Sequence, residues 1–335
     1  LVNLFCELLY PYLINYIYMK PKNCLIFGAS GQIGRNLIRT LTKNNIKVTA
    51  LTRNVHQKGY ILKTQANPGY LEIVEGSIFD YELIKKLFSN ADICVNLVGI
   101  LFEKGKNTFN NIHVEFPKMI SKLASTYKLE KFVHLSALGI ESAKDSTYAQ
   151  SKLKGEKEIL DNFNKTVIVR PSIVYSVDDN FSTQLMTLLG LLPIFPIYYN
   201  GKTKFRPIHC SDLTNSVTKI ITDDIRENVI EFVGPEEMSF KDILEKLLSL
   251  IEKKRILLPM PISLARMTAH IFELLPKPLI TNDQLNLLKY NNVLSGKYKS
   301  NNDFDFNCSS RFEDEVNKYA YMWKNEGEYS KKRVS

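Results

Sequence analysis

Short apolar runs alternate with helix-like patterns through the first half of the chain. Runs that read as buried strands lie at residues 24–27, 48–51, 71–74, 93–98, 132–135 and 167–169. Between the first two runs, Ile33, Leu37, Ile38 and Leu41 recur at helical spacing. Because strands that alternate with amphipathic helices form parallel sheets covered on both faces, this pattern predicts an α/β fold with a doubly wound parallel sheet.

The pattern changes after Pro171, where prolines become frequent and the helical stretches become shorter. Residues 239–251 still form a clear amphipathic helix, for which Ser239 is the expected N-cap. From Lys297 onward the chain turns polar, apart from aromatic residues such as Trp323, which would dock on a partner or on the fold itself. We therefore expect a sheet domain at residues 19–175, a smaller α-rich substrate-side or docking region at 176–296, interleaved with the sheet, and a polar tail at 297–335.

Residues 1–18 are apolar and aromatic, with Glu7 as their one charge. They lack the basic start and small-residue cleavage site of a signal peptide, and Pro11 interrupts a run already short for crossing a bilayer. Our hypothesis is that translation begins at Met19 and that residues 1–18 are an over-extended or disordered segment. The alternative is an amphipathic anchor on a membrane surface.

Composition narrows the class of protein further. Hydrophobic residues make up 44% and charged residues 24%, values typical of a folded globular chain. Basic residues exceed acidic ones by nine, partly through Lys331, Lys332 and Arg333, which suit an acidic partner, anionic lipid or simply solvent. No basic patch is interleaved with aromatics, so we expect no nucleic acid partner. Five scattered cysteines and five histidines without ligand spacing argue against disulfides and against a metal site.

A glycine-rich turn follows the first strand, at residues 28–34 (Gly-Ala-Ser-Gly-Gln-Ile-Gly). Gly28 allows the tight turn, Gly31 allows a pyrophosphate to approach, and Gly34 lets the helix pack on the strand. The backbone N–H groups around Ser30, Gln32 and Ile33 and the positive end of the helix dipole favour phosphate. The spacing is GxxGxxG instead of GxGxxG, and its place between a strand and a helix predicts a dinucleotide site of the Rossmann type.

Arg53 follows the second strand, where NAD-binding chains usually carry a carboxylate for the ribose 2′-hydroxyl. An arginine there favours the 2′-phosphate of NADP through charge-assisted hydrogen bonds. The sequence thus predicts NADPH as the preferred cofactor, against the alternative of a solvated surface arginine.

Tyr148 and Lys152 form a YxxxK pair on one face of a predicted helix. A nearby ammonium is expected to lower the pKa of the tyrosine, which would then exchange a proton with a carbonyl or alcohol. Ser136, at the end of the fifth strand, is the candidate third member of this catalytic set.

These motifs together resemble the extended or atypical short-chain dehydrogenases. Within that group, residues 22–294 are similar, in order, to the NADPH-binding accessory subunit of respiratory complex I and its bacterial relatives. The segments that carry the likeness are Asn96–Leu101, His134–Gly139, Ser176–Phe181 and Leu279–Leu285. Two residues depart from the group's pattern: Ser77 replaces an aspartate near the adenine, and Ser176 replaces a glycine on the nicotinamide side.

The resemblance implies a role for each matching residue. Gly28, Gly31 and Gly34 would meet the pyrophosphate, and Arg53 the adenosine phosphate. Gly99 would lie beside the cofactor, Tyr148 and Lys152 at the nicotinamide ribose, and Pro171 against the nicotinamide. The implied partners are complex I subunits, which would hold the chain on the cytoplasmic face of the inner membrane, with a peripheral contact to that membrane.

Two function classes follow. In the first, the chain is an accessory or assembly subunit of respiratory NADH:ubiquinone oxidoreductase in which NADPH is mainly structural. In the second, Tyr148 and Lys152 make it a catalytic NAD(P)-dependent reductase, epimerase or dehydratase on a small molecule.

Overall fold

The computed structural model describes residues 21–223 and 225–329. The hypotheses about residues 1–18, the Met19 start and the basic residues 331–333 lie outside the described residues. In the described part of the chain, an eight-stranded sheet runs in the order β14-β11-β6-β5-β4-β1-β2-β3, with every neighbouring pair parallel. Its strands are β1 (Asn23–Phe27), β2 (Lys47–Thr52), β3 (Leu71–Glu75), β4 (Ile93–Asn96), β5 (Lys131–Leu135), β6 (Thr166–Pro171), β11 (Val229–Phe232) and β14 (Lys299–Ser300).

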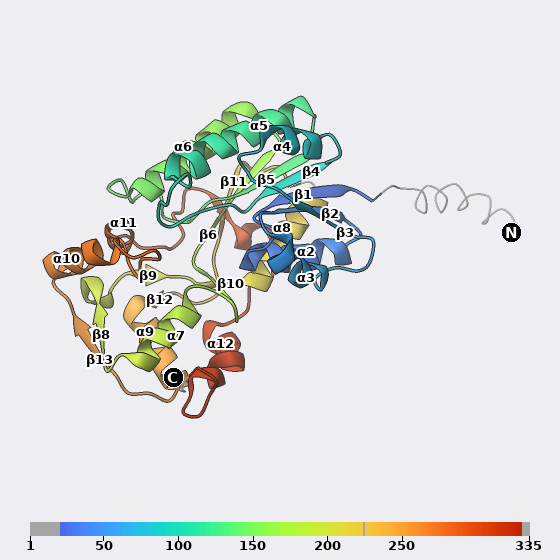
Figure 1. Cartoon of the computed structure of the whole chain (residues 1–335). Coiled ribbons are helices and arrows are strands. Elements are labelled where there is room, and N and C mark those ends of the chain that lie inside the picture. Colours follow the sequence, from blue (N-terminus) through green and yellow to red (C-terminus); the bar gives the residue numbers. More distant parts are fainter. Residues whose placement is uncertain (1–20, 224, 330–335) are drawn as a thin grey trace, which may run out of the picture.

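Helices cover both faces of this sheet, as the sequence predicted (Figure 1). One face carries α2 (Gln32–Lys43), α3 (Val55–Lys63) and α8 (Cys210–Thr222). The other carries α4 (Tyr81–Phe88), α5 (Phe116–Thr126) and α6 (Thr147–Asn162). Successive residues of β1 alternate between the two layers, because side chains point to opposite faces of a strand. The doubly wound architecture is therefore confirmed.

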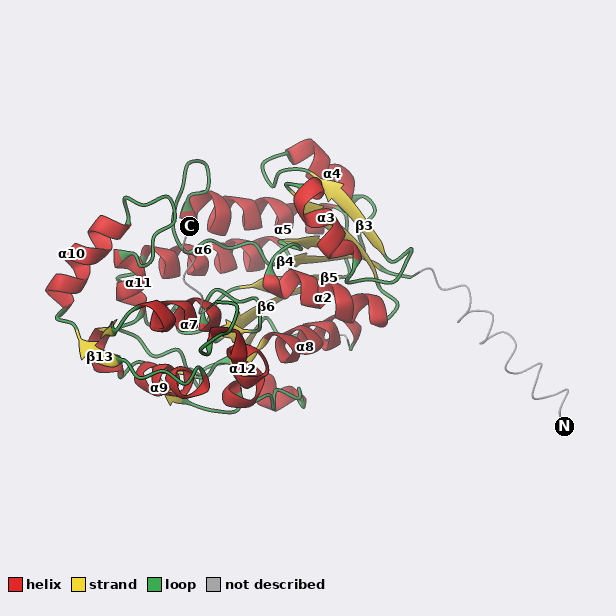
Figure 2. Cartoon of the chain, turned by 60° about the horizontal axis from the view of Figure 1, so that its bottom comes forward, coloured by secondary structure: helices red, strands yellow, loops and turns green. Residues whose placement is uncertain are grey.

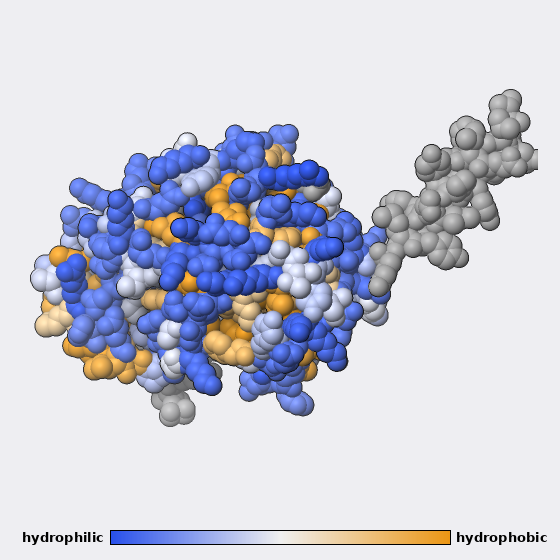
Figure 3. Space-filling view, turned by 90° about the horizontal axis from the view of Figure 1, so that it is seen from above, coloured by the Kyte–Doolittle hydropathy of each residue, from blue (hydrophilic) through white to orange (hydrophobic). Residues whose placement is uncertain are grey.

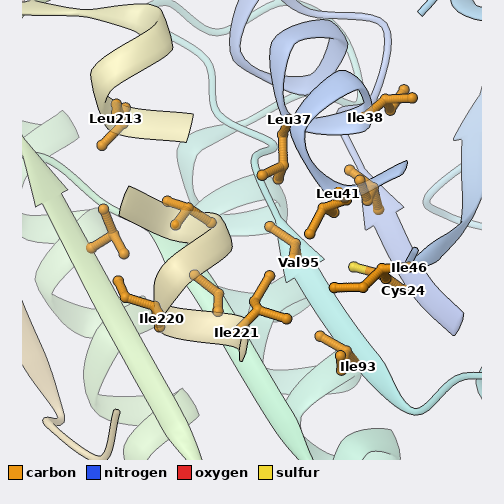
Figure 4. Close-up of a cluster of buried hydrophobic side chains, with 14 of the residues drawn as sticks. Cys24, Leu37, Ile38, Leu41, Ile46, Ile93, Val95, Leu213, Ile220 and Ile221 are labelled. Atoms are coloured by element: carbon orange, nitrogen blue, oxygen red, sulfur yellow. The ribbon is translucent and has the colours of Figure 1, made fainter. Parts of the chain in front are cut away.

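The core between α2, α8 and the sheet is built from aliphatic side chains. Figure 4 shows Leu37 and Leu41 of α2 and Ile221 of α8 gathered near Val95 of β4. The helical spacing of Leu37, Ile38 and Leu41, visible in the sequence, is what presents this apolar stripe to the sheet.

The strand order reverses between β1 and β4. Phe27 at the end of β1 lies opposite Leu51 of β2 on one side and Asn96 of β4 on the other. The connections from these strands leave in opposite directions, so their carboxyl ends border a crevice, the usual ligand position in doubly wound sheets.

A second lobe packs below the carboxyl ends of the strands (Figures 1 and 2). Its core lies between α7 (Ser182–Leu191), α9 (Phe240–Leu250) and α12 (Phe312–Ala320). Ser239 caps α9 through a complete capping box, as expected. The remaining elements are β7 (Val174–Tyr175), β8 (Ile194–Ile197), β9 (Lys204–Phe205), β10 (Ile208–His209), β12 (Met238–Ser239), β13 (Ile256–Pro259), α10 (Ile262–Phe272), α11 (Asn282–Leu287), a π-helix at Asn110–Glu115 and short 3₁₀ turns at Tyr198–Gly201, Asn301–Phe304 and Tyr321–Trp323.

Residues 297–329 differ from the expected polar tail. They contribute β14 to the main sheet and α12 to the second lobe. Phe312, Val316, Tyr319 and Trp323 are buried, since their spacing of three and four residues forms an apolar stripe within an otherwise polar segment. Trp323 docks on the fold itself, where its indole N–H donates to the Thr187 hydroxyl at 3.0 Å. None of the helices in residues 21–223 and 225–329 is long and apolar enough to cross a membrane.

Candidate dinucleotide site

The glycine turn joins β1 to α2 at the edge of the crevice. Gly28 has φ +82°, and a Cβ there would lie 3.0–3.2 Å from atoms of Leu97, which follows β4. A Cβ at Gly34 would lie 2.5 Å from the carbonyl oxygens of Gly28 and Ala29. Both positions therefore require glycine, the first for its backbone conformation and both for close packing.

Gly31 differs from Gly28 and Gly34, the other two glycines of the turn, in having open space beside it. Apart from its chain neighbours, a Cβ there would meet one atom of the described residues within 4 Å, the Gly28 carbonyl oxygen at 3.3 Å. Gly31 is also the N-cap of α2, and no side chain caps that helix. The first-turn N–H groups at Gln32, Ile33 and Gly34 thus lie at an uncapped helix start beside open space, which fits an incoming pyrophosphate.

A loop from the second lobe is tied to this turn. The Ser176 hydroxyl accepts a hydrogen bond from Gln32 Nε2 at 2.9 Å and donates to Asp178 Oδ1 at 2.7 Å. Arg35 forms an ion pair with Asp178 and donates to the Ser30 carbonyl at 2.7 Å. Ser176, the departure from the group's glycine, therefore supplies a link between the lobes. Arg35 and Asp178 escaped sequence reasoning, because nothing local pairs residues so far apart.

The residues expected on the adenine side follow the neighbouring strands. Arg53 comes directly after β2 and is exposed. Ser77 comes after β3, and its hydroxyl accepts a hydrogen bond from the Phe79 N–H at 3.2 Å. Ser77 thus shapes its own turn.

Lys152, on helix α6, lies at the carboxyl ends of β4 and β5. The side chain is 4% exposed, and its ammonium donates to the Leu135 carbonyl at 3.0 Å. A Cβ at Gly99 would stand 3.4 Å from that ammonium. Ser136 follows Leu135, and its buried hydroxyl has no hydrogen-bond partner within the described residues. Pro171 ends the adjacent strand β6, so Gly99, Ser136, Lys152 and Pro171 all gather at this edge of the sheet.

Tyr148 lies one turn before Lys152 on α6 and is partly buried. Burial, and to a lesser degree the charge of Asp283, raises its pKa to about 12. Burial lowers the pKa of Lys152 to about 8, against an opposing effect of Glu156. In the chain as folded, the pKa of Tyr148 is therefore shifted upward, opposite in direction to the expected effect of the ammonium, because loss of solvent and the charge of Asp283 both disfavour the phenolate.

A family profile described as the NAD dependent epimerase/dehydratase family matches residues 24–222, more than half of the chain. The chain belongs to this family. NAD(P) is thus the class of cofactor to which the turn and the gathered residues correspond.

Three comparisons show what this epimerase/dehydratase family member is similar to. It is 29% identical over 224 residues to NADH dehydrogenase [ubiquinone] 1 alpha subcomplex subunit 9 of Dictyostelium discoideum, covering 67% of this chain but 62% of that subunit, less than two thirds of its length. It is 23% identical to the NADH-ubiquinone oxidoreductase 40 kDa subunit of Neurospora crassa, covering 83% and 73%. The dTDP-glucose 4,6-dehydratase DesIV of Streptomyces venezuelae, solved with NAD, shares the fold, with a TM-score of 0.68, 15% identity and coverage of 91% and 97%.

His113 supports Tyr148 in this family member, although sequence reasoning did not select it. Its Nε2 accepts from the Ile100 N–H at 3.1 Å, and its Nδ1 bonds the Ser151 hydroxyl at 2.8 Å. That hydroxyl donates to the Tyr148 carbonyl at 2.7 Å, so Nδ1 carries the proton and the ring is neutral. Burial, together with Lys152, lowers its pKa to about 3. His113 stands in the π-helix, a rare structure frequent at functional sites and without a sequence signature.

Asp283, from α11, holds the start of α6. Its carboxylate accepts from the Thr147 N–H at 2.7 Å, the Tyr148 N–H at 3.2 Å, the Ser146 hydroxyl at 2.8 Å and the Thr147 hydroxyl at 2.9 Å. Figures 1 and 2 both show α11 beside this end of α6. The second lobe thereby caps the helix that carries Tyr148 and Lys152.

Arg170, in β6, binds helix α6 near the middle of that helix. Its guanidinium forms two bonds with Glu156, at 3.0 and 2.6 Å, and one with Glu141 at 2.9 Å. Partial burial opposes ionisation of Glu141, yet bonds from Tyr298, Arg170 and Lys297 bring its pKa down to about 2. Among residues 21–223 and 225–329, no cluster of histidine, cysteine, aspartate or glutamate could hold a metal ion.

Proposed function

We propose that the chain is an accessory or assembly subunit of respiratory NADH:ubiquinone oxidoreductase, complex I, in which bound NADPH is mainly structural. The observation that carries this proposal is the similarity to complex I subunits of Dictyostelium discoideum and Neurospora crassa, over 67% and 83% of the chain. Its partners are then other complex I subunits. Through them it lies peripherally on the inner membrane, and for a bacterial complex on the cytoplasmic face.

The position of the glycine turn supports a structural role for the nucleotide. The turn belongs to the sheet, and residues 176–179 of the second lobe bind it through Gln32–Ser176 and Arg35–Asp178. A dinucleotide at this junction would stabilise the arrangement of both lobes, because binding to the folded form alone adds to the free energy of unfolding.

Specific residues would hold each part of the cofactor. The α2 start with Gly28, Ser30, Gly31, Gln32, Ile33 and Gly34 would bind the pyrophosphate. Gly99 would allow close approach, Tyr148 and Lys152 would bind the nicotinamide ribose, and Pro171 would line the nicotinamide. When bound, the nicotinamide supplies hydride-transfer chemistry, while the Tyr148 phenol, with its pKa near 12, stays protonated at neutral pH.

Arg53 leads us to propose a preference for NADP over NAD. Purified protein should bind NADPH at least about tenfold more tightly than NADH, the scale of one charge-assisted contact. Arg53→Asp should narrow or invert this ratio, whereas Arg39→Asp, on the outer side of α2, should leave it unchanged. Isothermal titration with both nucleotides measures the ratio, and equal affinities in the unmutated protein would refute the preference.

The second candidate is a catalytic reductase, epimerase or dehydratase. The observation that favours it is the Ser136 hydroxyl, buried and without a partner in the described part of the chain, at the strand end beside Lys152. Such a group is available to a substrate oxygen. Ser136, Tyr148 and Lys152 would then form the catalytic set.

The two candidates predict different results for two substitutions. Gly31→Val fills the space that a pyrophosphate needs, so it should abolish nucleotide binding and remove about 2.7 kcal/mol of stability when NADPH stands a hundredfold above its Kd. Tyr148→Phe removes the hydroxyl alone and keeps the ring packing. For a structural cofactor, complementation of a deletion strain should fail with Gly31→Val and succeed with Tyr148→Phe.

The readouts are assembled complex I and NADH-driven quinone reduction. The control is Tyr60→Phe, at a tyrosine that is 70% exposed, which should behave as the unmutated chain. If Tyr148→Phe fails as completely as Gly31→Val while the protein stays folded and loaded with NADPH, proton transfer matters and the catalytic candidate is correct.

A further inference from the structure

A strap of residues 176–181 joins β7 to α7 and lies against the glycine turn. The Ser176 hydroxyl accepts a hydrogen bond from Gln32 Nε2 at 2.9 Å, and Asp178 forms an ion pair with Arg35. Gln32 and Arg35 stand at the start of α2, where the uncapped N–H groups lie beside open space. The second lobe is therefore attached at two points to the helix start that would bind a pyrophosphate.

The strap is itself tightly folded around Asp179, which is 5% exposed. The Asp179 carboxylate accepts from the N–H groups of Ser176 and Phe181 at 3.1 and 3.0 Å. The Ser182 hydroxyl also donates to this carboxylate, at 2.5 Å, and bonds the Tyr319 hydroxyl of α12 at 2.9 Å. Because these bonds tie the strap to the core of the second lobe, the strap is a rigid part of that lobe.

The ion pair between Arg35 and Asp178 is partly screened from water, with side chains 22% and 41% exposed. Partial burial opposes ionisation of Asp178, yet bonds from Ser176 and Arg35 hold its pKa below the ordinary value, so the carboxylate is charged at neutral pH. Another nitrogen of Arg35 donates to the Ser30 carbonyl at 2.7 Å, inside the glycine turn. One guanidinium thus joins the strap to the turn.

The open space beside Gly31 lies between the sheet and the strap. On the sheet side, the loop after β4 comes so near that a Cβ at Gly28 would lie 3.0 Å from the Leu97 carbonyl carbon. On the side of the second lobe stands the strap, bonded to Gln32 and Arg35. A dinucleotide in this space would therefore lie between two parts of the protein that the strap contacts hold together.

We propose that the strap controls nucleotide exchange: the Gln32–Ser176 and Arg35–Asp178 contacts must break before the second lobe can move aside and NADPH can enter or leave. The inference rests on the nucleotide site of the proposed function and adds the kinetics of its exchange. It gives the Ser176 hydroxyl a role that the glycine of the resembling group cannot supply. Slow exchange suits a cofactor that stays in place as part of the structure.

The test measures both nucleotide rates on the full chain. Mixing the NADPH-loaded chain with excess NADP⁺ gives the dissociation rate from the loss of NADPH fluorescence, and mixing free chain with NADPH gives the association rate. Ser176→Ala and Asp178→Asn should each raise the dissociation rate at least about threefold, the scale of one hydrogen bond or partly exposed ion pair.

The association rate should rise together with the dissociation rate. The strap contacts use protein groups alone, so their loss disfavours the closed arrangement equally with and without nucleotide. The Kd of NADPH should therefore change less than about twofold. A substitution that removed a contact to the nucleotide would instead weaken binding through the dissociation rate alone.

A double-mutant cycle tests whether Arg35 and Asp178 act as one contact. Arg35→Met should raise the dissociation rate at least as much as Asp178→Asn, because it also removes the bond to the Ser30 carbonyl. The double variant should be no faster than Arg35→Met alone, since the ion pair can be broken just once. Additive effects would contradict the pairing.

Two controls change residues outside the strap and the turn. Lys246→Met removes an ion pair of similar exposure, with Glu313, inside the second lobe. Leu274→Asn changes an exposed residue just after α10, toward the end of the molecule where apolar residues gather in Figure 3 and where α10 lies in Figure 1. Both variants should keep the two rates of the unmutated chain.

Circular dichroism should match the unmutated chain in every variant, which separates a faster exchange from loss of the fold. Unchanged rates in Ser176→Ala or in Asp178→Asn would overturn the inference, and so would faster dissociation with an unaltered association rate. Absence of NADPH binding by the unmutated chain would overturn both this inference and the structural nucleotide of the proposed function. NADPH binding with rates that ignore the strap would refute the strap and leave the proposed function standing.

Discussion

At the scale of single residues, burial is the largest cause of the pKa shifts in the site. Tyr148 and Lys152 stand one turn apart, yet the pKa of the phenol rises to about 12 and that of the ammonium falls to about 8. Both shifts favour the neutral form, which is the signature of groups removed from water. The same holds for His113, whose pKa falls to about 3.

The depressed pKa of Lys152 predicts a pH dependence of stability. Between pH 8 and 10.5 the lysine of the unfolded chain is protonated and that of the folded chain is not, so the unfolded state binds more protons and stability rises with pH. Relative to Lys152→Met, the unmutated chain without nucleotide should gain about 3 kcal/mol across this window. Urea unfolding of both proteins at pH 7.5, 9 and 10.5 measures the difference, and a constant difference would contradict the prediction.

At the scale of elements, α6 owes its position to contacts along its whole length. Asp283 caps its start, and Arg170 pairs with Glu156 near its middle. Gly155 allows it to lie against the π-helix, because a Cβ there would fall 1.8 Å from the His113 carbonyl oxygen. The helix is therefore a rigid support for Tyr148 and Lys152.

Asp283→Ala tests the capping contact. Loss of this cap should cost about 1–2 kcal/mol of stability. It should also lower the pKa of Tyr148 toward the value set by burial alone, because the carboxylate's charge disfavours the phenolate. An alkaline titration followed by carbon NMR of the tyrosine side chains measures the pKa of Tyr148.

The matched control is Asp80→Ala, which removes the N-cap of α4, where the Asp80 carboxylate accepts from the Leu83 N–H at 3.1 Å. It should cost similar stability without changing the titration of Tyr148. The same Tyr148 shift in both variants would show that Asp283 acts through general loosening of the fold.

At the scale of the whole molecule, the chain runs more than once between the two lobes, and the lobes contact each other. β11 and β14 return to the main sheet from the C-terminal half, and α12 completes the core of the second lobe. The junction between the lobes carries the glycine turn on one side and Asp283 on the other. A ligand bound at this junction would therefore contact the residues that hold the two lobes in position relative to each other.

Phe312→Ala tests the role of the C-terminal segment. Phe312 is buried and packs edge-on against Tyr175 with centroids 4.9 Å apart, so its truncation should cost about 3–5 kcal/mol. Tyr321→Ala, at an exposed position nine residues later, should change stability by less than about 0.5 kcal/mol. Chemical denaturation measures both, and equal effects would support the polar-tail expectation.

Several features could be predicted from the sequence because they depend on neighbours along the chain. Apolar runs that alternate with amphipathic helices predict a parallel sheet, because a strand that is apolar on both faces needs helices on both faces of its sheet. The glycine turn is recognisable because its steric demands act within seven residues, and the Tyr148 and Lys152 pair because helical spacing is local. The buried stripe of Phe312, Val316, Tyr319 and Trp323 has the same helical spacing, but the polar residues around it obscured the pattern.

Other features were decided by the tertiary structure alone. Asp283 reaches Thr147 across 136 positions of sequence, and Gln32 reaches Ser176 across 144. Periodicity shows which face of an element is apolar, but it does not show which distant carboxylate or hydroxyl that face will meet. The protonation of Tyr148, Lys152 and His113 likewise depends on how completely other segments exclude water, a property that exists only once the chain has folded.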